Sequence, residues 1–539
     1  MQAGLKKQHA LLFESRLNVV VLTPHLKHPS TLWPRPTTGN LKRLTAGRPP
    51  PSLPTMRILY LDIDTLRTDH LGCYGYLRDT SPNLDRIARE GVRMENCYVS
   101  DAPCLPSRAS MFTGRFGIHT GVVGHGGTAA DLRLIGPERG FNSFRQRPGF
   151  IWCLRERGLY PVSFSPFAER HSAWWFCEGW REMYNSGKCG NESAEEIVPP
   201  ALEWIGRNAR RDDWVLHINI WDPHTPYRAP ADFGNPFAGA PLEGWYTEDV
   251  RRRQWDGFGP GSPQEPAGAM GRPYDSPRQP DRIASMDDYR RWVDGYDCGI
   301  RYADQWCGRV LGALADAGVL DETIIIITSD HGESMGELAV IGDHQVADHI
   351  TSRVPMIIRW PGMTGGRIDT ALHYQTDVAA SLVELAGGKT PAHWDGRPFA
   401  DAFRAGRGEG RPYLVVSQNA WSCMRAVRWD DFLFIRPYHT GLKNYPARML
   451  FDVARDGHEL VNLADHDPKT AARGQALLDE WTAEMLAGGT EDPMQTVLRE
   501  GGPYHTRGRL ESYCRRLRET GRARHADFLA AHPAGLAEM

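Results

Sequence analysis

The residues that most clearly suggest chemistry lie between Ser100 and Arg115. This run reads Ser-Asp-Ala-Pro-Cys-Leu-Pro-Ser-Arg-Ala-Ser-Met-Phe-Thr-Gly-Arg, with Cys104 four residues before Arg108. Guanidinium groups form charge-assisted hydrogen bonds with anionic groups, so the two arginines could brace a charged substrate. The alternative for Cys104 is a small buried cysteine in a loop, which is what most free cysteines are. The choice between them depends on which other motifs accompany the cysteine.

Acidic residues follow two apolar runs that are typical of buried parallel strands. Residues 57–64 read Arg-Ile-Leu-Tyr-Leu-Asp-Ile-Asp, and residues 321–333 run through four isoleucines to Asp330 and His331. β-branched, continuous apolar runs of this length indicate strands that are covered on both faces. Open α/β sheets bind ligands at the carboxyl ends of their strands. Asp64, Asp330 and His331 are therefore expected to converge beside the loop that carries the cysteine.

Together these motifs resemble the signature of the type I sulfatases, within the alkaline phosphatase-like superfamily. That signature is C-x-P-S-R followed by T-G-R, and residues 65–75 and 80–91 match further segments of the family. The resemblance implies that a formylglycine-generating enzyme oxidises Cys104 to Cα-formylglycine, whose hydrated aldehyde is the nucleophile. An ordinary serine would leave a stable enzyme sulfate. A geminal diol can attack with one hydroxyl and expel sulfate by collapse through the other.

The resemblance also implies a divalent metal ion. Asp64, Asp330 and His331 match the family's metal-ligand positions, the modified cysteine also faces the ion, and hard carboxylate oxygens suit Ca²⁺. Many members carry two adjacent acids at the first strand end, whereas Thr65 follows Asp64 here. Asp62 lies on the same strand face and could supply the missing carboxylate. The alternative for Asp62 is a buried acid that backbone donors satisfy.

Histidines are the candidates for protonating the leaving group, because imidazole titrates near neutrality. His224 follows a predicted strand in Asp-Pro-His-Thr-Pro-Tyr, which resembles the family's H-x-P-Y segment, whose histidine contacts the sulfate ester. The alternative is a proline-rich turn with a surface histidine. Many relatives place a lysine nine residues before an Arg-Val-Pro segment, and counting back from Arg353 gives His344. His119 and His125 are further candidates.

The cationic pocket departs from that of better-known family members, which carry G-K-W-H-L-G. The equivalent region, residues 157–171, has neither that lysine nor that histidine. Arg170 and His171 are the nearest substitutes for binding substrate, and the alternative is a surface pair. In the cysteine loop, Arg108 and Arg115 are expected to brace the aldehyde and its sulfated form.

The remaining pattern predicts an α/β fold: a large mixed sheet sandwiched by helices, with a smaller C-terminal domain of antiparallel sheet plus helix. We expect a catalytic domain over 56–410, a small sheet and helix over 411–490, and an arm over 491–539 to which no chemistry is assigned. Residues 229–285 are rich in Pro, Gly and Arg and predict a long excursion that shapes substrate access. Residues 1–55 are interpreted as a disordered extension, or as a start site placed before the true one at Met56.

Composition limits the partners. The 539 residues carry a net charge of −3, which gives no indication of a nucleic-acid or membrane-surface partner. The sequence has no stretch of 18 apolar residues, so we expect no membrane span. The ten cysteines show no short metal-binding pairs, and a chain of this size needs no disulfides. We expect a cytoplasmic location, because no signal segment is recognised. Assembly of the chain into a homo-oligomer is possible.

The sequence thus predicts a metal-dependent sulfatase that acts on a small-molecule or saccharide sulfate ester. One alternative is a phosphonate monoester or phosphodiester hydrolase, because a related branch of the superfamily uses the same formylglycine and metal on phosphorus. Another is a catalytically silent protein that binds sulfated ligands and keeps Cys104 as a thiol. The complete set of Asp64, Cys104, Arg108, Asp330 and His331 argues against the silent protein.

Overall fold

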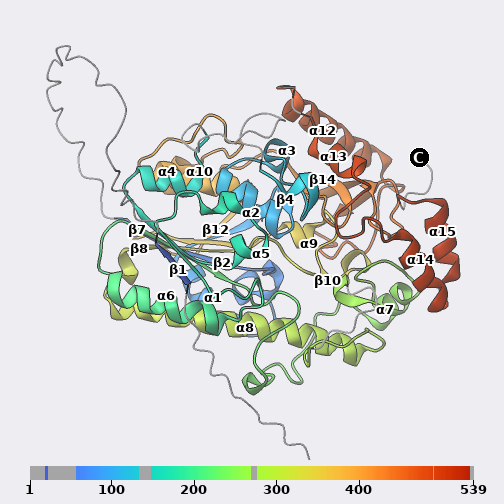
Figure 1. The fold of residues 1–539 in the computed structure, drawn as a ribbon, viewed down its shortest axis with the longest axis horizontal. Helices are drawn as coiled ribbons and strands as arrows, with labels where there is room; N and C mark the ends of the chain where they lie inside the picture. Colours follow the sequence, from blue (N-terminus) through green and yellow to red (C-terminus); the bar gives the residue numbers. More distant parts are fainter. Residues whose placement is uncertain are drawn as a thin grey trace, which may run out of the picture.

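A computed structural model describes residues 18–21, 56–132, 147–268, 276–363, 365–489 and 491–534. Within these residues the chain builds a large sheet between two helical layers, with a smaller sheet at one end (Figure 1). This arrangement confirms the predicted α/β class with its large mixed sheet and smaller second sheet. All ten cysteines are free, and none of the described helices is long and apolar enough to span a membrane.

The nine-stranded sheet has the order β1-β6-β5-β7-β2-β8-β11-β3-β12. Its centre is β2, which pairs in parallel with β7 and β8, while β11 runs antiparallel to β8 and to β3. The parallel centre places the carboxyl ends of β2, β7 and β8 at one edge. The strands span Asn18–Val21 (β1), Arg57–Ile63 (β2), Val92–Tyr98 (β3), Tyr160–Phe164 (β5), Glu182–Asn185 (β6), Trp214–Ile220 (β7), Thr323–Thr328 (β8), Met356–Arg359 (β11) and Arg367–Tyr374 (β12).

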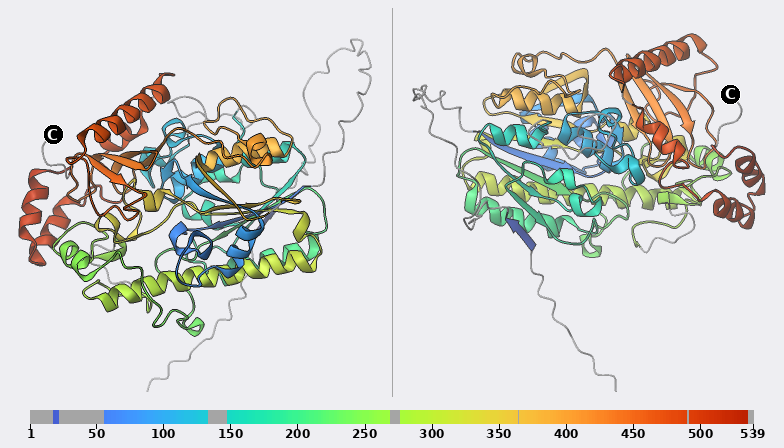
Figure 2. Two further views of the ribbon diagram at one scale, coloured as in Figure 1. Left: turned by 180° about the vertical axis from the view of Figure 1, so that it is seen from behind. Right: turned by 45° about the horizontal axis from the view of Figure 1, so that its top comes forward.

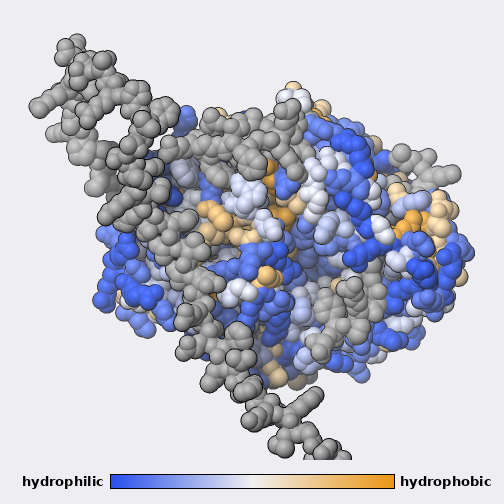
Figure 3. Space-filling model, in the orientation of Figure 1, coloured by the Kyte–Doolittle hydropathy of each residue, from blue (hydrophilic) through white to orange (hydrophobic). Residues whose placement is uncertain are grey.

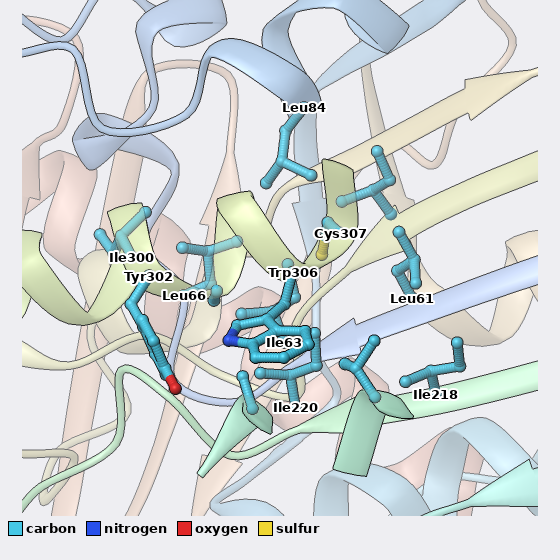
Figure 4. Packing of buried hydrophobic residues seen from close by; sticks show 14 of the residues in the cluster. Leu61, Ile63, Leu66, Leu84, Ile218, Ile220, Ile300, Tyr302, Trp306 and Cys307 are labelled. Atoms are coloured by element: carbon cyan, nitrogen blue, oxygen red, sulfur yellow. The ribbon is translucent and has the colours of Figure 1, made fainter. Parts of the chain in front are cut away.

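Alternate residues of β2 enter two different cores, because successive side chains of a strand point to opposite faces. Leu61 and Ile63 pack under α8 (Met286–Asp316) together with Ile218 and Ile220 of the neighbouring strand, as Figure 4 shows. Helices α1 (Pro82–Glu90) and α6 (Ala194–Asn208) complete that layer. Ile58 and Tyr60 face the other core, which α2 (Cys104–Thr113), α4 (Phe150–Glu156) and α10 (Gln375–Leu385) cover.

The smaller sheet has five strands in the order β16-β15-β14-β13-β4. Four come from the C-terminal part, and α12 (Pro468–Leu486) packs on them. The fifth, β4 (Asp101–Ala102), belongs to the cysteine loop and pairs in parallel with the end of β13. The C-terminal sheet therefore holds the segment that leads into Cys104. Its other strands span Leu414–Gln418 (β13), Cys423–Trp429 (β14), Phe432–His439 (β15) and Met449–Asp452 (β16).

The C-terminal arm consists of α13 (Pro493–Arg499), α14 (Leu510–Glu519) and α15 (Ala523–Ala531). In both views of Figure 2, α14 and α15 lie at the end of the molecule. They dock on the 229–285 excursion, where the buried carboxylate of Glu265 pairs with Arg516 at 3.0 Å and with Arg522. The face shown in Figure 3 is largely hydrophilic, with small scattered apolar areas.

Of residues 1–55, which the sequence predicts to be a disordered extension, the structure describes only four. Asn18–Val21 forms the edge strand β1 and pairs antiparallel with β6. The rest of residues 1–55 lies outside the described residues.

Candidate active site

Four donor groups meet where the central strands end. Ligand atoms of Asp64, Cys104, Asp330 and His331 lie within 4.8 Å of one another, and all four residues are buried. Asp64 directly follows β2, whereas Asp330 and His331 follow its parallel neighbour β8. Because the two strands run in register, their carboxyl ends bring these side chains together, as the sequence predicted for this edge.

Cys104 reaches this edge from the first turn of α2. Its Sγ lies 3.2 Å from Nε2 of His331, and the side chain is 1% exposed. Burial raises the pKa of the thiol well above its ordinary value, and the carboxylates of Asp64 and Asp330 raise it further. An unmodified Cys104 therefore stays a neutral thiol, which is a poor nucleophile.

Arg108 lies one turn along α2 and binds the acids from the other side. Its Nε and Nη2 donate to Asp62 at 2.8 and 3.0 Å, while Nη1 donates to Asp330 at 2.6 Å. Nη1 also lies 3.1 Å from Oδ2 of Asp64. Burial works to raise the pKa of Asp62, but Arg108 and His217 lower it to about 2. Asp62 is thus an ionised partner of Arg108 and stands outside the group of four donors.

The donor set suits a hard divalent ion. Neither carboxylate oxygen of Asp64 accepts a hydrogen bond from the described residues, although the side chain is fully buried, and the nearby Nη1 of Arg108 donates to Asp330 instead. Burial raises the pKa of Asp64, and the adjacent carboxylate of Asp330 raises it further. Buried, unsatisfied carboxylate oxygens are costly unless a cation neutralises them. Two carboxylates and an oxygen on a modified Cys104 would give Ca²⁺ the hard oxygen ligands it prefers, with the imidazole as a further donor.

Two predicted histidines lie next to this group. The ring centroid of His344 lies 4.1 Å from that of His331 and 6.1 Å from that of His224. Nδ1 of His224 bonds the carbonyl of Thr225, whereas Nδ1 of His344 is buried without a partner among the described residues. Burial lowers the pKa of both rings; neighbouring histidines act in the same direction on His344, and Arg170 and Arg228 do so on His224. Both imidazoles are therefore neutral until an anion arrives.

The predicted substrate-binding pair lies on α5 (Phe167–Arg170) and just beyond it. The guanidinium carbon of Arg170 lies 4.1 Å from the centroid of the Trp221 ring, and its positive charge acts on the pKa of Cys104. The ring of His171 contacts that of His125, with centroids 5.1 Å apart. Arg170 is therefore within electrostatic reach of the reacting centre.

The family comparison agrees with this geometry. The family model described as Sulfatase matches residues 57–388, which is more than half of the chain. The chain belongs to the sulfatase family. The match includes all four donor groups and Arg108, so the chain is classed as a sulfatase, an enzyme that hydrolyses sulfate esters.

The named relatives and similar folds include a sulfatase and other hydrolases. The N-acetylglucosamine-6-O-sulfatase of Bacteroides thetaiotaomicron is 22% identical over 515 residues, covering 82% of this chain and 89% of its own. The multifunctional alkaline phosphatase superfamily protein PehA of Trinickia caryophylli is 26% identical over 478 residues, covering 73% of this chain and 87% of its own. Among solved structures, the phosphonate monoester hydrolase of Agrobacterium radiobacter has a similar fold. It superposes with a TM-score of 0.61 at 18% identity and covers 80% of this chain and 96% of its own.

Two predicted residues of this sulfatase lie elsewhere. His119 is on α3 (Gly117–Thr120), with Nδ1 2.9 Å from Asp395 and Nε2 2.9 Å from the carbonyl of Met485. Arg115 donates to the carbonyl of His119 at 2.5 Å. The ten-residue helix α2 is about 15 Å long, and both residues lie beyond its far end. The structure therefore does not bring them to the donor group. Instead, His119 links the segment after α2 to Met485 of α12.

Sequence reasoning missed two histidines near the site. His217 interrupts the apolar run of β7 and lies 3.4 Å from the carboxylate of Asp62. The two polar residues of this otherwise apolar strand, His217 and Asn219, were the available signal. His505 lies in the arm, and its ring contacts His125 with centroids 5.0 Å apart. Nothing in the local sequence around His505 separates it from a surface histidine.

Proposed function

We propose that the protein hydrolyses sulfate esters through formylglycine at position 104, with a divalent metal held by Asp64, Asp330 and His331. One observation carries this proposal: Sγ of Cys104 lies inside the buried donor group, 3.2 Å from His331. As formylglycine, this residue would supply a hydrated aldehyde with one hydroxyl for attack and a second for releasing sulfate. The family membership and the neutral state of the unmodified thiol support the modification.

The metal, most suitably Ca²⁺, would supply positive charge beside the sulfate oxygens as charge develops there. The chain's own residues orient the ester. Arg108 is fixed by Asp62 and Asp330, so its position does not depend on substrate. Arg170 adds a second permanent charge within reach of Cys104. Both guanidinium groups can bind an anion by donating charge-assisted hydrogen bonds to it.

The leaving oxygen needs a proton, and His344 and His224 are the candidates. Their rings lie 6.1 Å apart on one side of the donor group. An imidazole within hydrogen-bond reach can protonate the departing alkoxide as its bond to sulfur breaks. The anionic ester raises the proton affinity of a neighbouring imidazole, which offsets the effect of burial.

A second candidate function is hydrolysis of phosphonate monoesters or phosphodiesters. The similarity of the fold to a phosphonate monoester hydrolase, and the relation to a multifunctional superfamily member, favour considering it. These substrates carry one negative charge near the reacting atom, as sulfate esters do. We infer that sulfate monoesters are preferred and that these phosphorus esters are side substrates.

Co-expression with and without a formylglycine-generating enzyme tests the proposal. Peptide mass spectrometry is expected to show an aldehyde at position 104 only after co-expression, together with turnover of sulfated sugars or aryl sulfates. Cys104→Ala is expected to abolish turnover, and the half-buried Cys153→Ala is the matched control that retains it. Full activity in protein whose Cys104 remains a thiol would overturn the mechanism.

A further inference from the structure

Three imidazoles from distant parts of the chain form one cluster. Ring centroids of His125 and His171 lie 5.1 Å apart, and those of His125 and His505 lie 5.0 Å apart. His125 follows α3, His171 follows α5, and His505 comes from the C-terminal arm. The arm therefore reaches the neighbourhood of the active site.

His505 is held firmly in this cluster. Its backbone N–H donates to the carbonyl of Ala420 at 3.0 Å, and its ring stacks on Trp421 with centroids 4.5 Å apart. Gln418, two residues before Ala420, donates to the carbonyl of His344 at 2.6 Å. The loop that supports His505 is thus fixed to the loop that carries a candidate proton donor.

The loop that carries His125 packs against the C-terminal arm. A Cβ atom added to Gly126 would lie 2.1 Å from the ring of Tyr504, so the glycine lets this ring pack against the loop. The backbone N–H of Thr128 donates to Glu500 at 3.1 Å. These contacts fix the distance between the two segments and hence the geometry of the imidazole pair.

One hydrogen bond joins the pair, between Nδ1 of His125 and Nε2 of His505 at 2.9 Å. Nε2 of His125 is buried without a partner among the described residues, and so is Nε2 of His171. In a neutral imidazole one nitrogen donates and the other accepts, and the partner of one nitrogen decides the role of the other. If Nε2 of His505 donates, His125 must present its own Nε2–H; in the reverse arrangement it presents a lone pair.

The surroundings favour an anion at Nε2 of His125. Burial is the main cause that lowers the pKa of His125, and the nearby His505, His171 and Arg170 act in the same direction, so the ring is neutral. Burial and the charge of Arg509 lower the pKa of His505 to about 4. An anionic ester drawn to Arg170 would repel a lone pair at Nε2 of His125, whereas an N–H there would bind it.

We propose that His505 is a positioning residue, which donates from Nε2 to Nδ1 of His125 and thereby presents the Nε2–H of His125 to the anionic ester. This inference deepens the proposed function and rests on it, because it assigns the arm a part in binding the sulfate ester. His171, whose free Nε2 lies beside His125, completes the same anion-binding wall.

Matched variants of the full chain test this inference. Gln at position 505 keeps a donor close to the place of Nε2, whereas Met has similar size and no donor. Inorganic sulfate, titrated calorimetrically with Ca²⁺ present, is expected to bind wild type and His505→Gln alike and His505→Met a few-fold more weakly, because only part of its His125 then carries the proton on Nε2. His525→Gln, on the outer part of the arm, is the control for docking. Equal weakening by Gln and Met, or none by Met, would overturn the inference.

A second readout does not depend on sulfate binding. In protein labelled with ¹⁵N at histidine, the signals of His125, assigned by their loss in His125→Gln, report which nitrogen carries the proton. We expect Nε2–H in wild type and in His505→Gln, and a mixture of tautomers in His505→Met. A proton on Nδ1 in wild type would overturn the inference. Because neither readout needs turnover, a failure of the proposed function would be recognised separately in the esterase assays.

Discussion

Arg108 and Asp62 form a two-pronged ion pair in the interior of the protein, with Nε and Nη2 at 2.8 and 3.0 Å from the two carboxylate oxygens. Because α2 carries Arg108 and β2 carries Asp62, the pair ties the nucleophile's helix to the central strand. It also leaves Nη1 directed at Asp330. The carboxylate of Asp62 is thereby committed to orienting a guanidinium group.

This arrangement predicts different metal contents for three conservative variants. Asp64→Asn and Asp330→Asn are expected to lose most of the bound metal, because each removes a carboxylate from the donor group. Asp62→Asn is expected to keep its metal and lose activity, because Arg108 loses its two-pronged ion pair and is held by Asp330 alone. Elemental analysis of the purified variants measures this, with thermal unfolding as the control for folding. A metal loss in Asp62→Asn equal to that in Asp64→Asn would contradict the assignment.

The identity of the proton donor can be tested with leaving groups of different acidity. His344→Ala is expected to lower kcat/KM about 100-fold or more for alkyl sulfates, which leave as strong bases and need the proton. For activated aryl sulfates the loss is expected to be small. The same series on His224→Ala compares the two neighbouring rings. If His344→Ala loses equally on both kinds of substrate, His344 is not the acid.

A buried lysine gives a prediction for stability and pH. Lys443 is 3% exposed, and burial lowers its pKa to about 7, although Asp343 and Glu265 act to raise it. A lysine with a depressed folded-state pKa destabilises the protein once pH falls below the unfolded value near 10.5, and the cost is complete below about pH 7. Lys443→Met is therefore expected to stabilise the fold by about 2–4 kcal/mol at pH 6 and by little at pH 10. Denaturant unfolding at the two pH values measures this, and an equal effect at both would contradict it.

Much of the fold was predictable because it depends on local patterns. The apolar run at 57–64 and the isoleucines before Asp330 predicted the two central strands, and parallel pairing then placed their acids together. The partner of Asp62 was not predictable, because it depends on how α2 packs on the sheet. The same holds for His505, which reaches His125 from 380 residues away along the chain.

The N-terminal prediction can be tested by truncation. A chain that begins at Met56 loses the edge strand β1, whose pairing partner among the described residues is β6. Since the central strands and the donor group are untouched, activity is expected to stay within about twofold and Tm to fall by a few degrees at most, the size of a shift expected from about 1 kcal/mol. Steady-state kinetics and thermal unfolding measure this. Aggregation of the truncated protein would show that the extension covers the sheet edge.

Substrate charge gives the last prediction. A sulfate monoester carries one negative charge near the reacting atom, whereas a phosphate monoester carries nearly two at neutral pH. The guanidinium of Arg108 is already neutralised by Asp62 and Asp330, and the facing histidines are neutral. Beside the proposed metal, Arg170 therefore supplies much of the permanent positive charge that the protein itself offers the ester, which suits a single negative charge.

We accordingly expect kcat/KM to be highest for sulfate monoesters, measurable for phosphonate monoesters and phosphodiesters, and lowest for phosphate monoesters. Arg170→Gln is expected to weaken every anionic substrate, by at least about tenfold in KM, because a hydrogen bond to a charged group is lost. Arg170→Lys, which keeps the charge, is the matched control and is expected to recover part of the loss. A phosphate monoester that outruns every sulfate ester would show that the site holds more positive charge than these residues provide.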